Sequence, residues 1–162
     1  MHMPSSHRPI LAGGLVAGTL DLVYICTLWG AKGVAPIRIL HSIASGWVGR
    51  EAAIAGGMHT ALLGLVSHYA IATCMAAAYW CAARRLPALA RRPFAYGPLY
   101  GVVLYVAMNH VVVPLSAAGP AAPMPAWMVA SHLAAHMFLV GTTIAWFAHR
   151  ATNLRCAMAA AP

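Results

Sequence analysis

The chain has 162 residues, of which 62% are hydrophobic and only 7% are charged, and its mean hydropathy is +0.74. A soluble domain carries about 25% charged residues and at this length could not bury so much apolar surface, so the composition excludes a soluble globular protein. The formal net charge of +8 would suggest nucleic-acid binding in a soluble chain. Here the arginines stand at the ends of apolar segments, where basic residues orient membrane helices, so the expected partner is the lipid bilayer and not nucleic acid.

Four apolar segments are each long enough to cross a bilayer, which needs about 20 residues in a helix. They are continuous rather than alternating, so they predict helices and not the strands of a barrel. The predicted helices cover about residues 9–29, 57–83, 93–115 and 125–149. The expected fold class is all-α, a polytopic membrane protein built as a four-transmembrane-helix bundle. One domain covers residues 1–156, and 157–162 form a short C-terminal tail.

The long connection after the first helix, PIRILHSIASGWVGRE, has helical periodicity. One face carries apolar residues, namely Ile37, Leu40, Ile43, Ala44 and Trp47. The opposite face is polar and carries Arg38, His41, Ser42 and Ser45. Two interpretations stay open: an amphipathic helix that lies flat at the membrane interface, or an ordinary connector with a tryptophan anchor.

Basic residues are distributed unequally between the two ends of the predicted helices. One end carries Arg8, Arg84, Arg85, Arg91, Arg92, Arg150 and Arg155, whereas the other carries Lys32, Arg38 and Arg50. Because basic residues favour the cytoplasmic side, this asymmetry predicts that both termini and the 84–92 loop are cytoplasmic.

Small residues recur at a spacing of about four along three of the predicted helices. The stripes are Gly14 and Gly18, then Gly57, Ala61 and Gly64, and finally Gly97 and Gly101. Such stripes allow helices to approach closely in lipid. Because four helices have a limited interior, the stripes also predict a homo-oligomer or a partner membrane subunit.

Polar side chains inside the predicted helices are the best functional clue, because an ionisable group in lipid costs about 2.5–3.5 kcal/mol. The candidates are Asp21, His68, Asn109, His132 and His136. At about 1.5 Å per residue, all except His132 lie about 9–16 Å from the outer ends of four different helices. We expect these four to converge on one polar site about halfway through the membrane, with His132 one turn outward at its entrance.

The chemistry of this expected site stays open between several functions. It could relay a proton or bind a small ligand, because histidine titrates near neutrality. Asp21, His68 and His136 could bind a metal ion, and two mid-span histidines could hold haem iron. Alternatively, the polar residues only specify helix packing, as in an accessory or scaffold membrane subunit. Only two side-chain carboxyls occur, which excludes a paired-carboxylate hydrolase, and no motif names an enzymatic reaction or a cofactor.

Five segments spread over nearly the whole chain carry a resemblance to known proteins: AGTLD, PIRILHSIASGWVGREA, GLVSHYAIA, YGPLYGVVLYVAMNHVVVPLS and AHMFLVG. Together they resemble a group of small bacterial inner-membrane proteins of unassigned function, distant relatives of the YagU-like family. The resemblance implies a four-helix protein of the bacterial inner membrane. It implies no reaction and therefore gives no residue a catalytic role.

Overall fold

The computed structural model describes residues 7–120 and 122–159, and within these residues every regular element is a helix. Four helices are long and apolar enough to cross a membrane: Arg8–Gly30, Gly57–Arg85, Pro93–Leu115 and Ala126–Asn153. The predicted all-α class and the number and positions of the four long apolar helices are confirmed.

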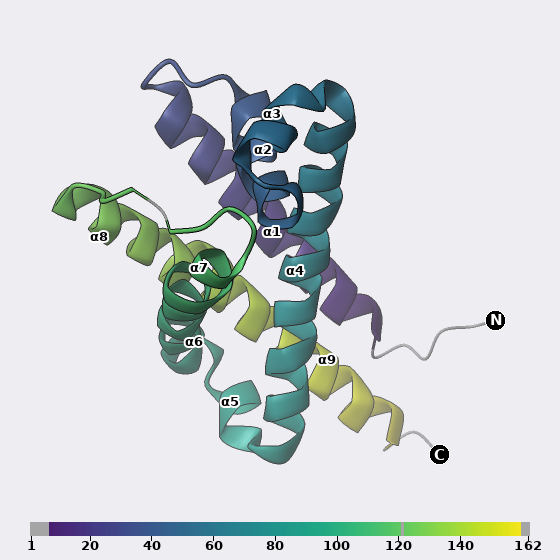
Figure 1. Ribbon diagram of the computed structural model, residues 1–162. Coiled ribbons are helices and arrows are strands. Elements are labelled where there is room, and N and C mark those ends of the chain that lie inside the picture. The colour runs from purple at the N-terminus through teal and green to yellow at the C-terminus, as the bar shows by residue number, and fades with distance from the viewer. Residues whose placement is uncertain (1–6, 121, 160–162) are drawn as a thin grey trace.

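The two later candidate spans are each divided by a π-helical turn, and short helices connect the spans (Figure 1). The elements in chain order are α1 (His7–Gly30), α2 (Pro36–Val48), α3 (Arg50–Ala55), α4 (Gly57–Arg85), α5 (Pro87–Arg91), α6 (Pro93–Ala107), η1 (Met108–Val112), α7 (Val113–Leu115), α8 (Ala126–Ala135), η2 (His136–Gly141) and α9 (Thr142–Ala159). The last helix therefore continues into the predicted tail.

Proline and glycine punctuate the chain between these helices. Pro36, Pro87 and Pro93 stand in the first turns of α2, α5 and α6, where a fixed φ suits the helix and the missing N–H costs least. Gly49 has a φ of 83° and separates α2 from α3, a conformation that residues with a side chain rarely adopt.

Helix α1 packs antiparallel against α4 through its glycine stripe. A β-carbon on Gly14 would lie 2.6 Å from Cα of Thr73, and one on Gly18 would lie 3.1 Å from the ring of Tyr69. Residue numbers rise along α1 while they fall along α4, so the two helices run in opposite directions. The small residues thus permit the close approach that the sequence predicted.

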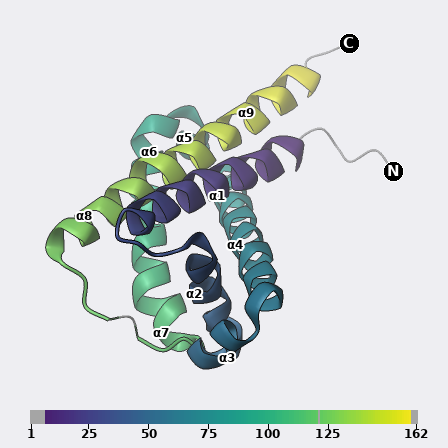
Figure 2. The ribbon, with the colours of Figure 1, turned by 90° about the horizontal axis from the view of Figure 1, so that it is seen from above.

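On another side, α1 runs antiparallel to α8, η2 and α9. Gly13 packs against Phe147 near one end, and the hydroxyls of Tyr24 and Ser131 lie 2.7 Å apart near the other. Seen from above, α1 and the α8–α9 helix lie side by side (Figure 2).

The glycine pair of α6 serves the same purpose against the fourth span. A β-carbon on Gly97 would lie 2.6 Å from Cα of Thr142, and one on Gly101 would meet the backbone of His136 and Met137. The glycines of both GxxxG motifs therefore pack against helices of their own chain. The predicted oligomer stays a prediction, without the support that these stripes were expected to supply.

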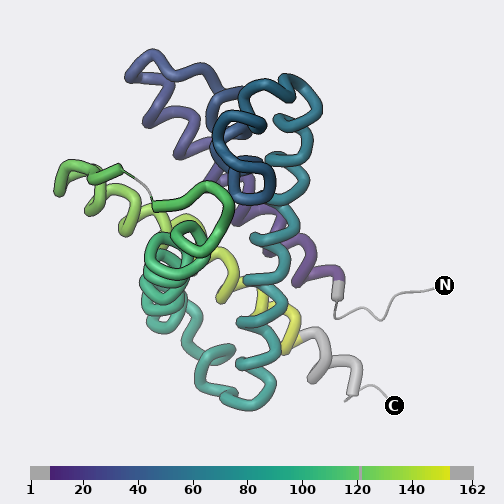
Figure 3. The backbone as a smooth tube through the Cα atoms, viewed as in Figure 1, coloured from purple at the N-terminus to yellow at the C-terminus, as the bar shows by residue number. Residues whose placement is uncertain are grey.

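Helices α4 and α6 are tied together near the arginine-rich end of the molecule. The Tyr100 hydroxyl of α6 donates to the carbonyl of Met75 in α4 at 2.8 Å, and its ring packs on Tyr79 with centroids 4.9 Å apart. Towards the other end, α4 packs with α1 and α2, whereas α6 continues through η1 into α7. The backbone trace in Figure 3 shows the same arrangement, with α2 and α3 at the end of α4 opposite the arginine-rich end.

The amphipathic segment does form a helix, α2, which lies across the first turns of α4 and is seen nearly end-on in Figure 1. Part of its polar face is turned into the protein, since its buried residues are Ile39, His41, Ala44 and Ser45. The reason is that Gly64 of α4 lets the backbone of α2 approach at Leu40, which turns the polar side towards α4. There His41 Nε2 donates to the Gly57 carbonyl at 2.9 Å, whereas Trp47, expected on the buried face, is 65% exposed.

Candidate functional site

His68 lies at the contact between α1 and α4. Its Nε2 atom donates to the backbone carbonyl of Gly18 at 2.8 Å, and its ring packs edge-on against Tyr69. Because a carbonyl only accepts, this bond places the proton of the neutral imidazole on Nε2. The bond partner of His68 is therefore the backbone of α1, one turn before Asp21, and not the Asp21 carboxylate.

Asp21 belongs instead to the side of α1 that faces α8. Tyr24, one turn further along the same face, binds Ser131 and packs edge-on against the ring of His132, with centroids 5.6 Å apart. Helical spacing therefore places Asp21 on the face of α1 that lies next to His132 of the fourth span, without a hydrogen bond or ion pair between the two side chains among the described residues.

His132 is only 8% exposed and is therefore buried between α8 and α1. The sequence placed it one turn from His136, at the entrance of the site; the structure has it one turn from His136 but with a buried side chain. Its burial follows from the antiparallel packing of the two helices, which stacks Tyr24 on the imidazole. Within the described residues, neither the His132 imidazole nor the Asp21 carboxylate makes a hydrogen bond.

His136 and Asn109 meet at Tyr105 of α6. The His136 ring packs edge-on against the Tyr105 ring, with centroids 5.5 Å apart, and its Nδ1 donates to the His132 carbonyl at 2.9 Å. Asn109 Nδ2 donates to the Tyr105 carbonyl at 2.9 Å. Both bonds run to the preceding turn of the same helix.

These contacts, together with Asp21 one turn before Tyr24 on the same face of α1, define one polar cluster that crosses three of the four spans. We name it the α1–α8 polar cluster, and its members are Asp21, Tyr24, Tyr105, Asn109, Ser131, His132 and His136. Four of the five predicted site residues belong to this cluster, whereas His68 is bonded elsewhere on α1.

Two π-helical turns contribute to the cluster. The first, η1, contains Asn109, and the second, η2, begins at His136. A π turn carries one extra residue and is common at functional sites, because it re-aims the side chains around it. Nothing in the hydrophobic pattern of the two spans distinguishes these turns from α-helix.

Sequence reasoning missed the aromatic and hydroxyl members of the cluster. Tyr24 follows Asp21 at a spacing of three, and Tyr105 precedes Asn109 at a spacing of four, so helical spacing from the charged residues was the available signal. It also missed Lys32, whose Nζ lies 5.3 Å from the Trp29 ring centre and 4.6 Å from that of Trp127. This cation–π pair ties the end of α1 to the start of α8.

The metal site predicted from Asp21, His68 and His136 has no geometric support in the described part of the chain. No three His, Cys, Asp or Glu side chains there lie close enough together to hold a metal ion. Two of the three residues already donate to backbone carbonyls through one ring nitrogen. The haem alternative stays a prediction.

Comparison with known protein families, with curated proteins and with solved structures found no match to this chain. The resemblance to YagU-like inner-membrane proteins therefore stays a prediction, and the function has to be argued from the site itself.

Proposed function

We propose that the protein is a multi-pass protein of the bacterial inner membrane, with both termini in the cytoplasm, in which Asp21 and His132 together bind a proton inside the membrane. One observation carries the proposal. These are two ionisable side chains on neighbouring spans, and both lack a hydrogen bond within the described residues. His68, Asn109 and His136, by contrast, are each bonded to a backbone carbonyl.

The physical argument rests on the cost of an isolated charge in lipid. A carboxylate and an imidazole in the membrane each need a partner, and a shared proton satisfies both because Asp accepts while His donates. Burial of His132 against Tyr24 keeps the imidazole at the carboxylate-bearing face of α1. Intramembrane Asp and His pairs are typical of proton relays.

His136 supplies a second imidazole beyond His132. Its Nδ1 is bonded to the His132 carbonyl, which leaves Nε2 without a hydrogen bond among the described residues. A proton released by His132 would therefore find an acceptor one helical turn further into the membrane. This order, Asp21 to His132 to His136, is the relay that we propose.

A second candidate is an accessory membrane subunit whose polar residues only specify helix packing. The bond from His68 to Gly18 and the one between Tyr24 and Ser131 favour it, because each joins two spans. This alternative predicts that replacing Asp21 changes stability but no proton-dependent signal.

Proton flux through proteoliposomes tests the proposal. A pH gradient is imposed across vesicles that contain the full chain, and its decay is followed with a trapped pH-sensitive dye. We expect Asp21→Asn and His132→Gln each to slow the decay to that of protein-free vesicles. The control His68→Gln removes a bonded histidine outside the cluster and should leave the flux at the wild-type value.

A second readout separates the site from the transport step. The imidazole nitrogen NMR signals of His132 should shift in Asp21→Asn, whereas those of His68 should not, because only His132 faces Asp21. Unchanged His132 signals in a folded Asp21→Asn protein would show that the two residues share no proton, and the proposal would then be wrong.

A further inference from the structure

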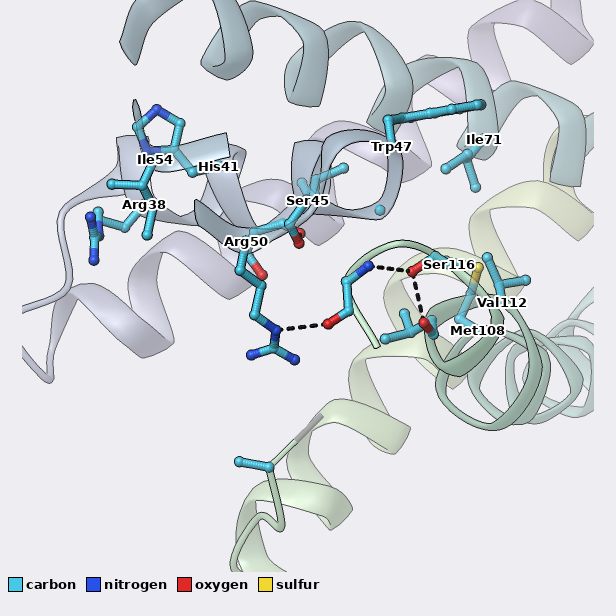
Figure 4. Close-up of a pocket in the computed structure, with 16 residues that line it drawn as sticks. Arg38, His41, Ser45, Trp47, Arg50, Ile54, Ile71, Met108, Val112 and Ser116 are labelled. Carbon is cyan, nitrogen blue, oxygen red and sulfur yellow. Dashed lines mark hydrogen bonds between the residues drawn. The ribbon is translucent and has the colours of Figure 1, made fainter. Parts of the chain in front are cut away.

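A pocket of about 620 Å³ lies at the outer ends of the helices, outside the α1–α8 polar cluster (Figure 4). Helices α2 and α3 cover it, and Ile71 of α4 stands on one wall. Met108 and Val112 of η1 stand on the opposite wall. Its volume is in the range of sites that hold small organic molecules.

The pocket lies between α4 and η1, two elements that do not pack closely against each other. Helices α4 and α6 are tied at Tyr100 and Met75, whereas Ile71 and Met108 lie further towards the outer end, where each helix has different neighbours. Trp47 of α2 reaches over the opening, and its Nε1 donates to Ser67 of α4 at 3.0 Å. The indole is therefore held as a wall of the pocket although it is 65% exposed.

Two arginines supply the charge of the pocket. Arg50 donates through Nε to the Ala118 carbonyl at 2.8 Å and through one terminal nitrogen to the Pro120 carbonyl at 2.9 Å (Figure 4 shows the first bond). These bonds fix the guanidinium but leave its charge unpaired. Arg38 makes no hydrogen bond or ion pair with the described residues, and no acidic side chain lines the pocket among them.

The apolar and the cationic parts of the pocket lie at different levels. Ile71, Met108 and Val112 belong to candidate membrane spans, whereas both arginines lie on the α2–α3 connection outside the spans. An apolar region at membrane depth that ends in unpaired positive charge matches a molecule with an acyl chain and a negatively charged head.

We infer that this pocket binds one phospholipid with an anionic head group. Its phosphate lies beside Arg50, which acts as a charge-assisted donor, and its acyl chain lies along Ile71, Met108 and Val112. Arg38 adds a second positive charge at the rim of the pocket, towards the other end of α2. A free phosphate would use the arginines alone and leave the apolar walls uncovered. An uncharged lipid would leave the arginines without a counter-charge. The inference does not depend on the proposed proton site, since no lining residue belongs to that cluster.

The test is native mass spectrometry of the full chain released from nanodiscs that contain equal amounts of phosphatidylglycerol and phosphatidylcholine. We expect one retained lipid, with phosphatidylglycerol strongly preferred. Arg38→Gln should lower this preference about fivefold, the effect typical of one basic residue near anionic lipid. Arg38 makes no side-chain hydrogen bond or ion pair within residues 7–120 and 122–159, so its replacement breaks none there. The matched control Arg92→Gln removes the same charge at the opposite end and should leave the preference unchanged.

A second pair of variants tests the apolar wall. Val112→Trp fills the pocket and should abolish lipid retention, whereas Val111→Trp changes an equally exposed neighbour that does not line it. Equal retention of the two lipids, or equal effects of Arg38→Gln and Arg92→Gln, would overturn the inference. Equal affinity of soluble glycerol phosphate for Val112→Trp and for the wild type would also overturn the inference, since the site would then hold a free anion.

Discussion

At the scale of single residues, glycine decides how closely the third and fourth spans approach. Gly101 lies against the backbone of His136 and Met137, and Gly141 lies in turn against Gly97 and Gly101. Backbone atoms cannot move aside as a flexible side chain can. The position of His136 beside Tyr105 therefore depends on the absence of a single methyl group at Gly101.

Replacing Gly101 by alanine should lower the free energy of unfolding by about 1–3 kcal/mol, because the new β-carbon would meet the backbone of η2. The control is Gly30→Ala, where no atom lies within 4 Å of the added carbon. Unfolding in mixed micelles measures both variants. Equal stability of the two would show that α6 and η2 do not pack as closely as the structure has them.

At the scale of elements, the π turn η2 ends where Thr142 binds back to Met137. The Met137 carbonyl accepts both the backbone N–H of Thr142 and its hydroxyl, the latter at 2.9 Å. These two hydrogen bonds to one carbonyl stabilise the wider turn that begins at His136. The geometry of the polar cluster is thus supported by a threonine that is not itself a member.

Thr142→Val keeps the shape of the side chain but removes this hydroxyl, so we expect a loss of about 0.5–1.5 kcal/mol in the free energy of unfolding. The adjacent Thr143 makes no side-chain hydrogen bond with the described residues, and Thr143→Val serves as the matched control. Hydrogen exchange along 136–142 should rise only in the Thr142 variant. Faster exchange in both variants, or in neither, would contradict the proposed support of η2.

At the scale of the whole molecule, spans that follow one another in the chain run in opposite directions, and the first and fourth spans also pack antiparallel. Near the arginine-rich end, His149 of α9 donates through Nδ1 to the Ala90 carbonyl of α5 at 2.7 Å. At the other end, Lys32 joins Trp29 and Trp127 by cation–π contacts. The ends of the four spans therefore gather at two opposite ends of the molecule. The unequal distribution of basic residues in the sequence is a difference between these two ends.

Reporter fusions test the orientation that this asymmetry predicts. At the C-terminus, a reporter that works only in the cytoplasm should be active. In the 116–124 loop, a reporter that works only in the periplasm should be active, since basic residues favour the cytoplasmic side. A periplasmic C-terminus would show that the seven arginines do not control the insertion of this chain.

The sequence by itself determined the four long apolar helices. Their predicted limits agree with the structure to within a few residues, as for 93–115 and Pro93–Leu115. This agreement has a physical reason: the length and hydropathy of a span are properties of one continuous segment, which no contact with another segment changes. The glycine stripes could be predicted for the same reason, whereas the helices against which they pack could not.

Only the tertiary structure decided which polar residues meet. The position of a residue along its helix gives the depth of the side chain but not the helix that it faces. Asp21 and His68 were therefore expected to lie together. In the structure His68 bonds to α1 at Gly18, whereas Asp21 lies on the face of α1 that packs against α8. The buried face of α2 depended on a single glycine of α4. The pocket joins residues from α2, α3, α4 and η1, and its space depends on how these elements are placed relative to one another, which no single segment encodes.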